Sequence, residues 1–116
     1  MLKRNEKEYW KSGVMVSIVI RLKANGWVFN RIEEDQYEDE DLRFDNVFAV
    51  FDNTYPRECL YIGWSRIGNK ASVTFEPIPD ETIGFDLPTL KAIYDLASAV
   101  KSADDIYRIK TIAKEI

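Results

Sequence analysis

The spacing of the apolar residues changes along this chain of 116 residues, and that change limits the folds open to it. Between residues 46 and 76 there are three short apolar runs. The first two are apolar on both faces, which suggests interior strands, and the third, residues 71–76, alternates with the period of a β-strand. From Pro88 onward, apolar residues recur every three or four positions, as they do on one face of an α-helix. A sheet region followed by helices is typical of an α+β fold.

The dipeptide Gly68-Asn69 predicts a two-residue turn between the last two strands. Counting outward from this turn places Trp64 opposite Val73, so that apolar side chains meet across a hairpin. The sheet region is therefore expected to continue as an antiparallel meander.

Residues 14–23 fit two structures. They are apolar at alternate positions and rich in β-branched side chains, which favours a strand, and Asn25-Gly26 then provides a hairpin turn. The alternative is a helix over residues 5–24, since Gly is equally common just past the end of a helix. Residues 1–12 are expected to form a short helix or an arm.

Two helices are expected within residues 86–116, separated only by Lys101-Ser102, with one kinked helix as the alternative. The predicted fold is α+β, an antiparallel β-meander of four to five strands over residues 13–76. The C-terminal helical pair packs on one face, over Leu60 and Ile62. One domain is expected to span residues 1–116, since single domains commonly have about 100 to 200 residues.

Composition removes several classes of function. The chain has no His, which excludes histidine-based triads and zinc sites, and its single Cys59 excludes intrachain disulfides and cysteine-rich metal centres. We expect Cys59 to be a packing residue, and we expect no enzymatic activity, no cofactor and no metal. A small carboxylate-dependent enzyme is a minor alternative, with Asp45, Asp52 and Glu58 beside the strand ends.

The longest apolar stretch, residues 14–20, is far shorter than the roughly 18 to 20 residues that cross a bilayer. The charges around it do not fit a secretory signal. A single Cys fits a reducing compartment, so we expect a cytoplasmic protein without a membrane partner.

Seven of the nine residues from 33 to 41 are acidic, and none is basic. The remainder has 13 acids and 16 bases, so the formal charge of −4 combines a segment of −7 with a body of +3. One interpretation is a solvated loop that only keeps the chain soluble. The other is a negative patch that attracts a basic partner, with Tyr37 and Phe44 as apolar anchors.

The candidate partner-binding residues are Glu33, Glu34, Asp35, Tyr37, Glu38, Asp39, Glu40, Asp41 and Phe44. A calcium loop built on Asp35, Asp39 and Asp41 is a further alternative, but it lacks the Gly and the terminal Glu of an EF-hand loop.

Aromatic and basic residues also gather around the middle strands, as in a surface that binds single-stranded nucleic acid. The members of this alternative surface are Tyr55, Arg57, Tyr61, Trp64, Arg66 and Lys70. The calculated pI of about 4.9 opposes this hypothesis, because nucleic-acid-binding domains are usually basic.

The sequence therefore predicts a non-enzymatic protein-binding module whose partner is another protein with a basic surface. In size and charge the chain resembles small acidic proteins of phages and mobile elements that disable host nucleic-acid-binding enzymes. That resemblance implies an inhibitor or an adaptor. Self-association into a homo-oligomer stays open.

Overall fold

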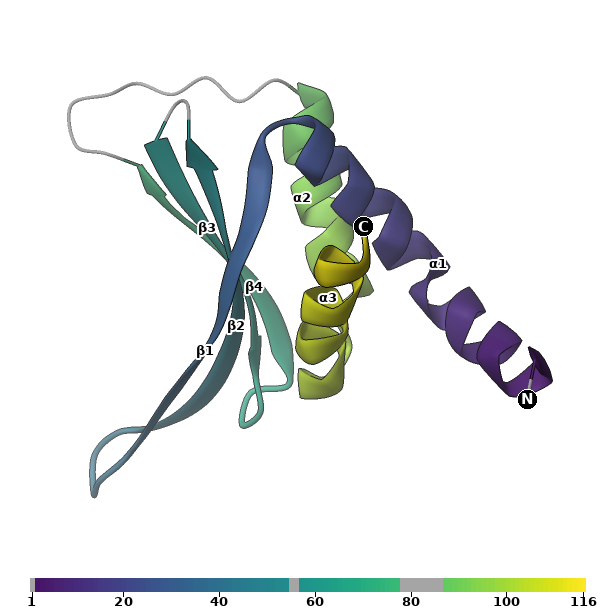
Figure 1. Cartoon of the computed structure of the whole chain (residues 1–116). Helices are drawn as coiled ribbons and strands as arrows, with labels where there is room; N and C mark the ends of the chain where they lie inside the picture. Colours follow the sequence, from purple (N-terminus) through teal and green to yellow (C-terminus); the bar gives the residue numbers. More distant parts are fainter. Residues whose placement is uncertain (1, 55–56, 78–86) are drawn as a thin grey trace.

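The described part of the chain forms one helix, then four strands, then two more helices (Figure 1). The computed structural model describes residues 2–54, 57–77 and 87–116, with side chains described for 13–53, 58–76 and 90–116. The elements are α1 (Leu2–Ala24), β1 (Trp27–Glu38), β2 (Arg43–Thr54), β3 (Arg57–Ser65), β4 (Lys70–Pro77), α2 (Leu87–Ala99) and α3 (Ala103–Glu115). The predicted α+β fold with an antiparallel meander and a C-terminal helical pair is confirmed.

The prediction of a strand at residues 14–23 is wrong, because these residues belong to helix α1. Met15, Ile18 and Leu22 are buried on one side of the helix, whereas Val14 and Ile20 are 61% and 49% exposed. Burial of this helical stripe outweighs the preference of β-branched residues for strands.

Asn25-Gly26 ends α1 and does not form a hairpin turn. The amide of Asn25 donates to the carbonyls of Arg21 and Leu22 at 3.1 and 3.0 Å. Gly26 has a φ of 89°, a conformation that favours glycine and is common just past a helix end. The alternative prediction, a helix capped by this dipeptide, is therefore correct.

The four strands pair in the order β1-β2-β3-β4, all antiparallel, so β1 and β4 are the edge strands. Trp64 pairs with Ala71, two residues away from the predicted partner Val73. The turn spans residues 66–69, longer than predicted, and the amide of Asn69 donates to the carbonyl of Ser65 at 2.8 Å. A shift of two residues leaves each side chain on its predicted face.

The acidic segment is mostly a strand. Residues 33–38 complete β1 and pair with residues 48–43 of β2, so only residues 39–42 form the turn. The expectation of a solvated loop over the whole segment is therefore wrong. Pairing with the apolar partners Phe44 and Phe48 supports the strand despite the low β propensity of acidic residues.

All three helices lie on one side of the sheet (Figure 1). Helix α3 packs on β1, β2 and β3, helix α2 packs on β4, and α1 packs mainly on the other two helices. Leu60 and Ile62 are fully buried beneath the helices, as predicted, and Trp27 and Phe51 are also in this core. No helix in the described part of the chain is long and apolar enough to cross a membrane.

The hairpin of β1 and β2 extends beyond the helix layer (Figure 1). At this end of the sheet, the turn at residues 39–42 projects away from the packed core. The segment with the highest density of charge is thereby placed where a second molecule can reach it.

Candidate functional site

We define the acidic arm as residues 33–46, which comprise the end of β1, the turn and the start of β2. The alternation of a strand divides its β1 side chains between two faces. Glu33, Asp35 and Tyr37 lie on the open face, and Glu34, Gln36 and Glu38 lie on the face that carries the helices. From Asp35 to Asp45, with both ends included, there are six acids and one base, a net charge of −5.

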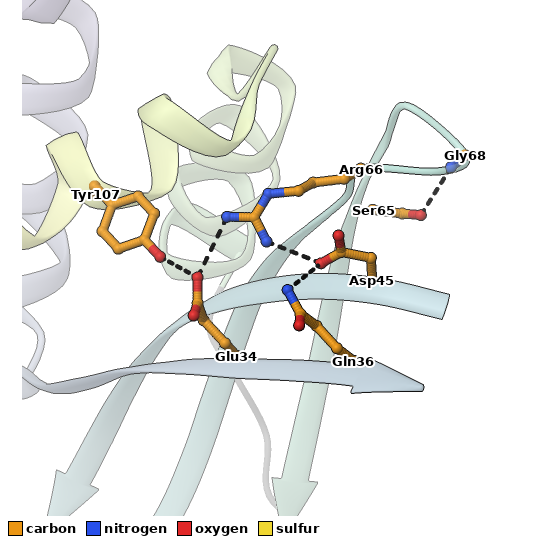
Figure 2. A network of polar contacts seen from close by, with 7 residues as sticks. All are labelled: Glu34, Gln36, Asp45, Ser65, Arg66, Gly68 and Tyr107. Atoms are coloured by element: carbon orange, nitrogen blue, oxygen red, sulfur yellow. Dashed lines mark hydrogen bonds and ion pairs between the residues drawn. The ribbon is translucent and has the colours of Figure 1, made fainter. Parts of the chain in front are cut away.

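A polar network anchors the base of the arm to the body (Figure 2). The guanidinium of Arg66 contacts Oδ1 of Asp45 at 2.9 Å and Oε1 of Glu34 at 3.3 Å. The hydroxyl of Tyr107 donates to the same oxygen of Glu34, and Nε2 of Gln36 donates to Asp45 at 3.2 Å. The network thus joins β1, β2, the turn after β3 and helix α3.

This network changes the acidity of its members. The hydrogen bond from Tyr107 and then that from Arg66 lower the pKa of Glu34, while the bond to Glu34 raises the pKa of Tyr107. The contact with Asp45 raises the pKa of Arg66. Glu34 and Arg66 are therefore engaged within the protein and hold the arm in place.

Asp39 organises the turn of the arm. Its Oδ1 accepts hydrogen bonds from the amides of Asp41 and Leu42 at 2.8 and 2.7 Å, and its Oδ2 accepts one from the hydroxyl of Tyr37 at 2.6 Å. These bonds lower the pKa of Asp39, with the bond from Tyr37 contributing most. Asp39 is therefore a structural residue, so its carboxylate is not freely available to a partner.

The remaining acids differ in how far they are neutralised. Glu33 lies 3.6 Å from Arg31, and Glu38 lies 3.9 Å from Arg43, both as exposed pairs of little energetic weight. Three further carboxylates, those of Asp35, Glu40 and Asp41, have no ion pair or hydrogen bond in the part of the chain that the structure describes. These three provide the unneutralised negative charge of the arm.

Apolar side chains accompany this charge. The rings of Tyr37 and Phe44, a cross-strand pair, stack with centroids 5.7 Å apart and an interplanar angle of 22°. Tyr37, Leu42 and Ile67 are 47%, 54% and 43% exposed. Seven residues line an open cavity of about 250 Å³: Gln36, Tyr37, Glu38, Arg43, Phe44, Asp45 and Ile67. The structure therefore brings the two predicted anchors together and places Ile67 with them in the cavity lining, while Leu42 is exposed in the turn.

The residues of the alternative nucleic-acid surface do not share one face. Tyr61 lies on the open face, where its hydroxyl donates to Glu76 at 3.2 Å, whereas Trp64 packs against the core beneath the helices. Arg66 is engaged in the network of Figure 2, and Lys70 is exposed at the start of β4. Tyr55 and the side chain of Arg57 lie outside the described residues.

The carboxylates considered for acid-base chemistry are also separated. Asp45 and Asp52 are seven residues apart on β2, about 24 Å at 3.4 Å per residue, and on opposite faces. Glu58 is 4% exposed and faces the helices. Burial and the nearby Asp52, whose Oδ1 lies 3.2 Å from Sγ of Cys59, raise the pKa of this thiol and disfavour the thiolate.

Among the described residues, no group of three or more His, Cys, Asp or Glu side chains is arranged to hold a metal ion. Comparison with protein-family models, with curated proteins and with solved structures finds no match for this chain. The fold and site therefore define the protein only by class, as a small α+β protein with a projecting acidic arm.

Proposed function

We propose that this protein is a non-enzymatic protein-binding module that contacts a basic surface of another protein through its acidic arm. The partner's basic residues would face Asp35, Glu40 and Asp41, and its apolar residues would cover the stack of Tyr37 and Phe44. We further propose that it acts in the cytoplasm as an inhibitor or an adaptor, a role that its size and charge support.

The observation that carries this proposal is the pairing of unneutralised charge with exposed apolar surface on a projecting element. The three free carboxylates lie within a few residues of the stacked Tyr37 and Phe44. Charge of one sign accelerates encounter with an oppositely charged surface, and aromatic side chains commonly supply the affinity of an interface. Both contributions are present on the acidic arm.

An affinity capture tests this proposal with two matched variants. The arm-amide variant replaces four acids of the arm: Asp35→Asn, Glu38→Gln, Glu40→Gln and Asp41→Asn. It spares Glu34 and Asp39, whose hydrogen bonds maintain the arm. The body-amide control makes the same change in charge elsewhere, through Glu76→Gln, Asp95→Asn, Asp104→Asn and Glu115→Gln. Circular dichroism confirms that each variant folds.

Immobilised wild-type protein and both variants are incubated with an extract of the cells that produce the protein, and mass spectrometry quantifies the retained proteins. The wild type and the body-amide control are expected to retain the same partner, which is lost with the arm-amide variant and at high salt. Equal retention by all three proteins would show that the arm does not bind the partner.

A further inference from the structure

The arm offers a backbone edge as well as charge. Among the residues that the structure describes, strand β1 is at the edge of the sheet and pairs only with β2. A β-bulge at Phe29–Arg31 divides it into two parts. The first part lies beside helices, since Phe29 and Asn30 share a cavity with Val19 of α1 and Ala113 of α3. The second part, residues 32–38, continues into the projecting arm.

The ladder indicates which backbone groups of this segment point away from β2. The amide of Asp39 donates to the carbonyl of Leu42 at 2.9 Å, so these two residues form a hydrogen-bonded pair. Antiparallel pairs alternate between hydrogen-bonded and non-hydrogen-bonded, so Glu38, Gln36 and Glu34 belong to non-hydrogen-bonded pairs with β2. The carbonyl of Asp45, the partner of Gln36, accepts from the amide of Arg66 on the opposite side of β2. The N–H and C=O groups of Glu34, Gln36 and Glu38 therefore point outward from the sheet.

Charge determines which strand can occupy this edge. A second copy of the chain paired through the same segment would place acidic side chains opposite acidic side chains, which is destabilising. An extended segment rich in Lys and Arg would instead place a base opposite an acid on both faces of the sheet. The charges of β1 thus discourage self-pairing and favour a basic strand.

We propose that the partner adds a basic extended segment to the free edge of β1 along residues 32–38, as an additional strand of the sheet. This inference rests on the proposed function and specifies how the arm binds. Main-chain hydrogen bonds to Glu34, Gln36 and Glu38 would fix the register. Basic side chains would face Glu33 and Asp35 on the open face, and an apolar side chain would lie beside Tyr37.

Hydrogen exchange measured by NMR tests this arrangement directly. The probe is a short synthetic peptide of Lys, Arg, Thr and Val with basic residues on both faces of its extended form. The amides of Glu34, Gln36 and Glu38 should exchange rapidly in the free protein and become protected at least about tenfold when the peptide binds. The amides of Asp35 and Tyr37, which already take part in the ladder with β2, should change little.

Two substitutions at one uncharged position separate backbone pairing from charge. Gln36→Pro removes an outward N–H without removing a bond to β2, and edge strands tolerate such a proline. Gln36→Ala also loses the bond to Asp45 but keeps the N–H, so it is the matched control. The peptide should bind Gln36→Pro at least about tenfold more weakly than Gln36→Ala. If the proline variant does not fold, the hydrogen exchange of the wild-type amides with bound peptide tests strand addition by itself.

The outcomes distinguish this inference from the proposed function. Binding without added protection at Glu34, Gln36 and Glu38, and with equal affinity for both Gln36 variants, would overturn strand addition. The capture experiment would still support the arm as a binding site in that case. A peptide that does not bind wild-type protein at low salt would also overturn strand addition, whereas only the arm-amide capture decides the proposed function.

Discussion

Replacing Gly63 with Ala tests how the open face of the sheet is packed. Gly63 of β3 pairs with Phe48 of β2, whose ring lies over the glycine. A Cβ atom at Gly63 would be 2.6 Å from Cδ1 of Phe48 and 2.8 Å from Oγ of Ser72. Carbon atoms in contact are about 3.5 Å apart, so the ring would have to move by about 0.9 Å. That movement disturbs its edge-to-face contact with Tyr61.

The size of the effect follows from two opposing contributions. Overpacking of this kind costs about 2 kcal/mol, and removing a glycine from a strand recovers about 0.7 kcal/mol. Gly63→Ala should therefore lower the free energy of unfolding by about 1 kcal/mol, measured by urea denaturation with an unchanged m-value.

A double-mutant cycle with Phe48→Ala identifies the cause. Once the ring is removed, a methyl group at Gly63 no longer meets Cδ1 of Phe48, and its remaining close neighbour is Oγ of Ser72. Since this hydroxyl can rotate about χ1, Gly63→Ala should be neutral or stabilising in that background. The expected coupling is about 1 to 2 kcal/mol. Effects of the two substitutions that add to within about 0.4 kcal/mol would refute the proposed packing of Phe48 on Gly63.

Three further predictions concern the helix, the network and the thiol. Leu22→Ala should lower the free energy of unfolding by about 2 to 5 kcal/mol, whereas Ile20→Ser should change it by under about 0.5 kcal/mol; similar losses would contradict the helical face of α1. The folded-state pKa of Glu34 lies below its unfolded value, so its stabilisation is present above about pH 4 and is lost at lower pH. The difference in Tm between wild type and Glu34→Gln should therefore shrink from pH 6 to pH 3, and a constant difference would contradict this reasoning. Alkylation of Cys59 should be slower than that of a free thiol at neutral pH and faster in Asp52→Asn, and an unchanged rate would show that Asp52 does not suppress the thiolate.

The fold class could be predicted because β2 and β3 are short apolar runs bounded by turn signals, β4 alternates with the period of a strand, and the last two helices have a helical period. The period is ambiguous in residues 14–23, because Ile18 and Leu22 fit both one face of a strand and the apolar stripe of a helix. Only their burial against the other helices selects the helix. The sequence does not indicate the strand at residues 33–38, because acidic residues have low β propensity and this strand depends on pairing with β2.

Part of the geometry of the candidate site could be predicted. The sequence places Tyr37 and Phe44 within one segment, and the two rings meet because they pair across the turn. The bonds of Tyr107 and Arg66 to Glu34 could not be predicted, since they join residues 73 and 32 positions apart. Such contacts require the docking of α3 and the register of three strands, neither of which a local pattern specifies.

The salt dependence of the dissociation constant for the captured partner tests the central claim most directly. Wild-type protein and the arm-amide variant are titrated with the purified partner over a range of salt concentrations. If the acidic arm binds a basic surface, wild-type affinity falls steeply with salt, and the variant binds weakly with a much shallower dependence. The same affinity and the same salt dependence for both proteins would contradict the claim.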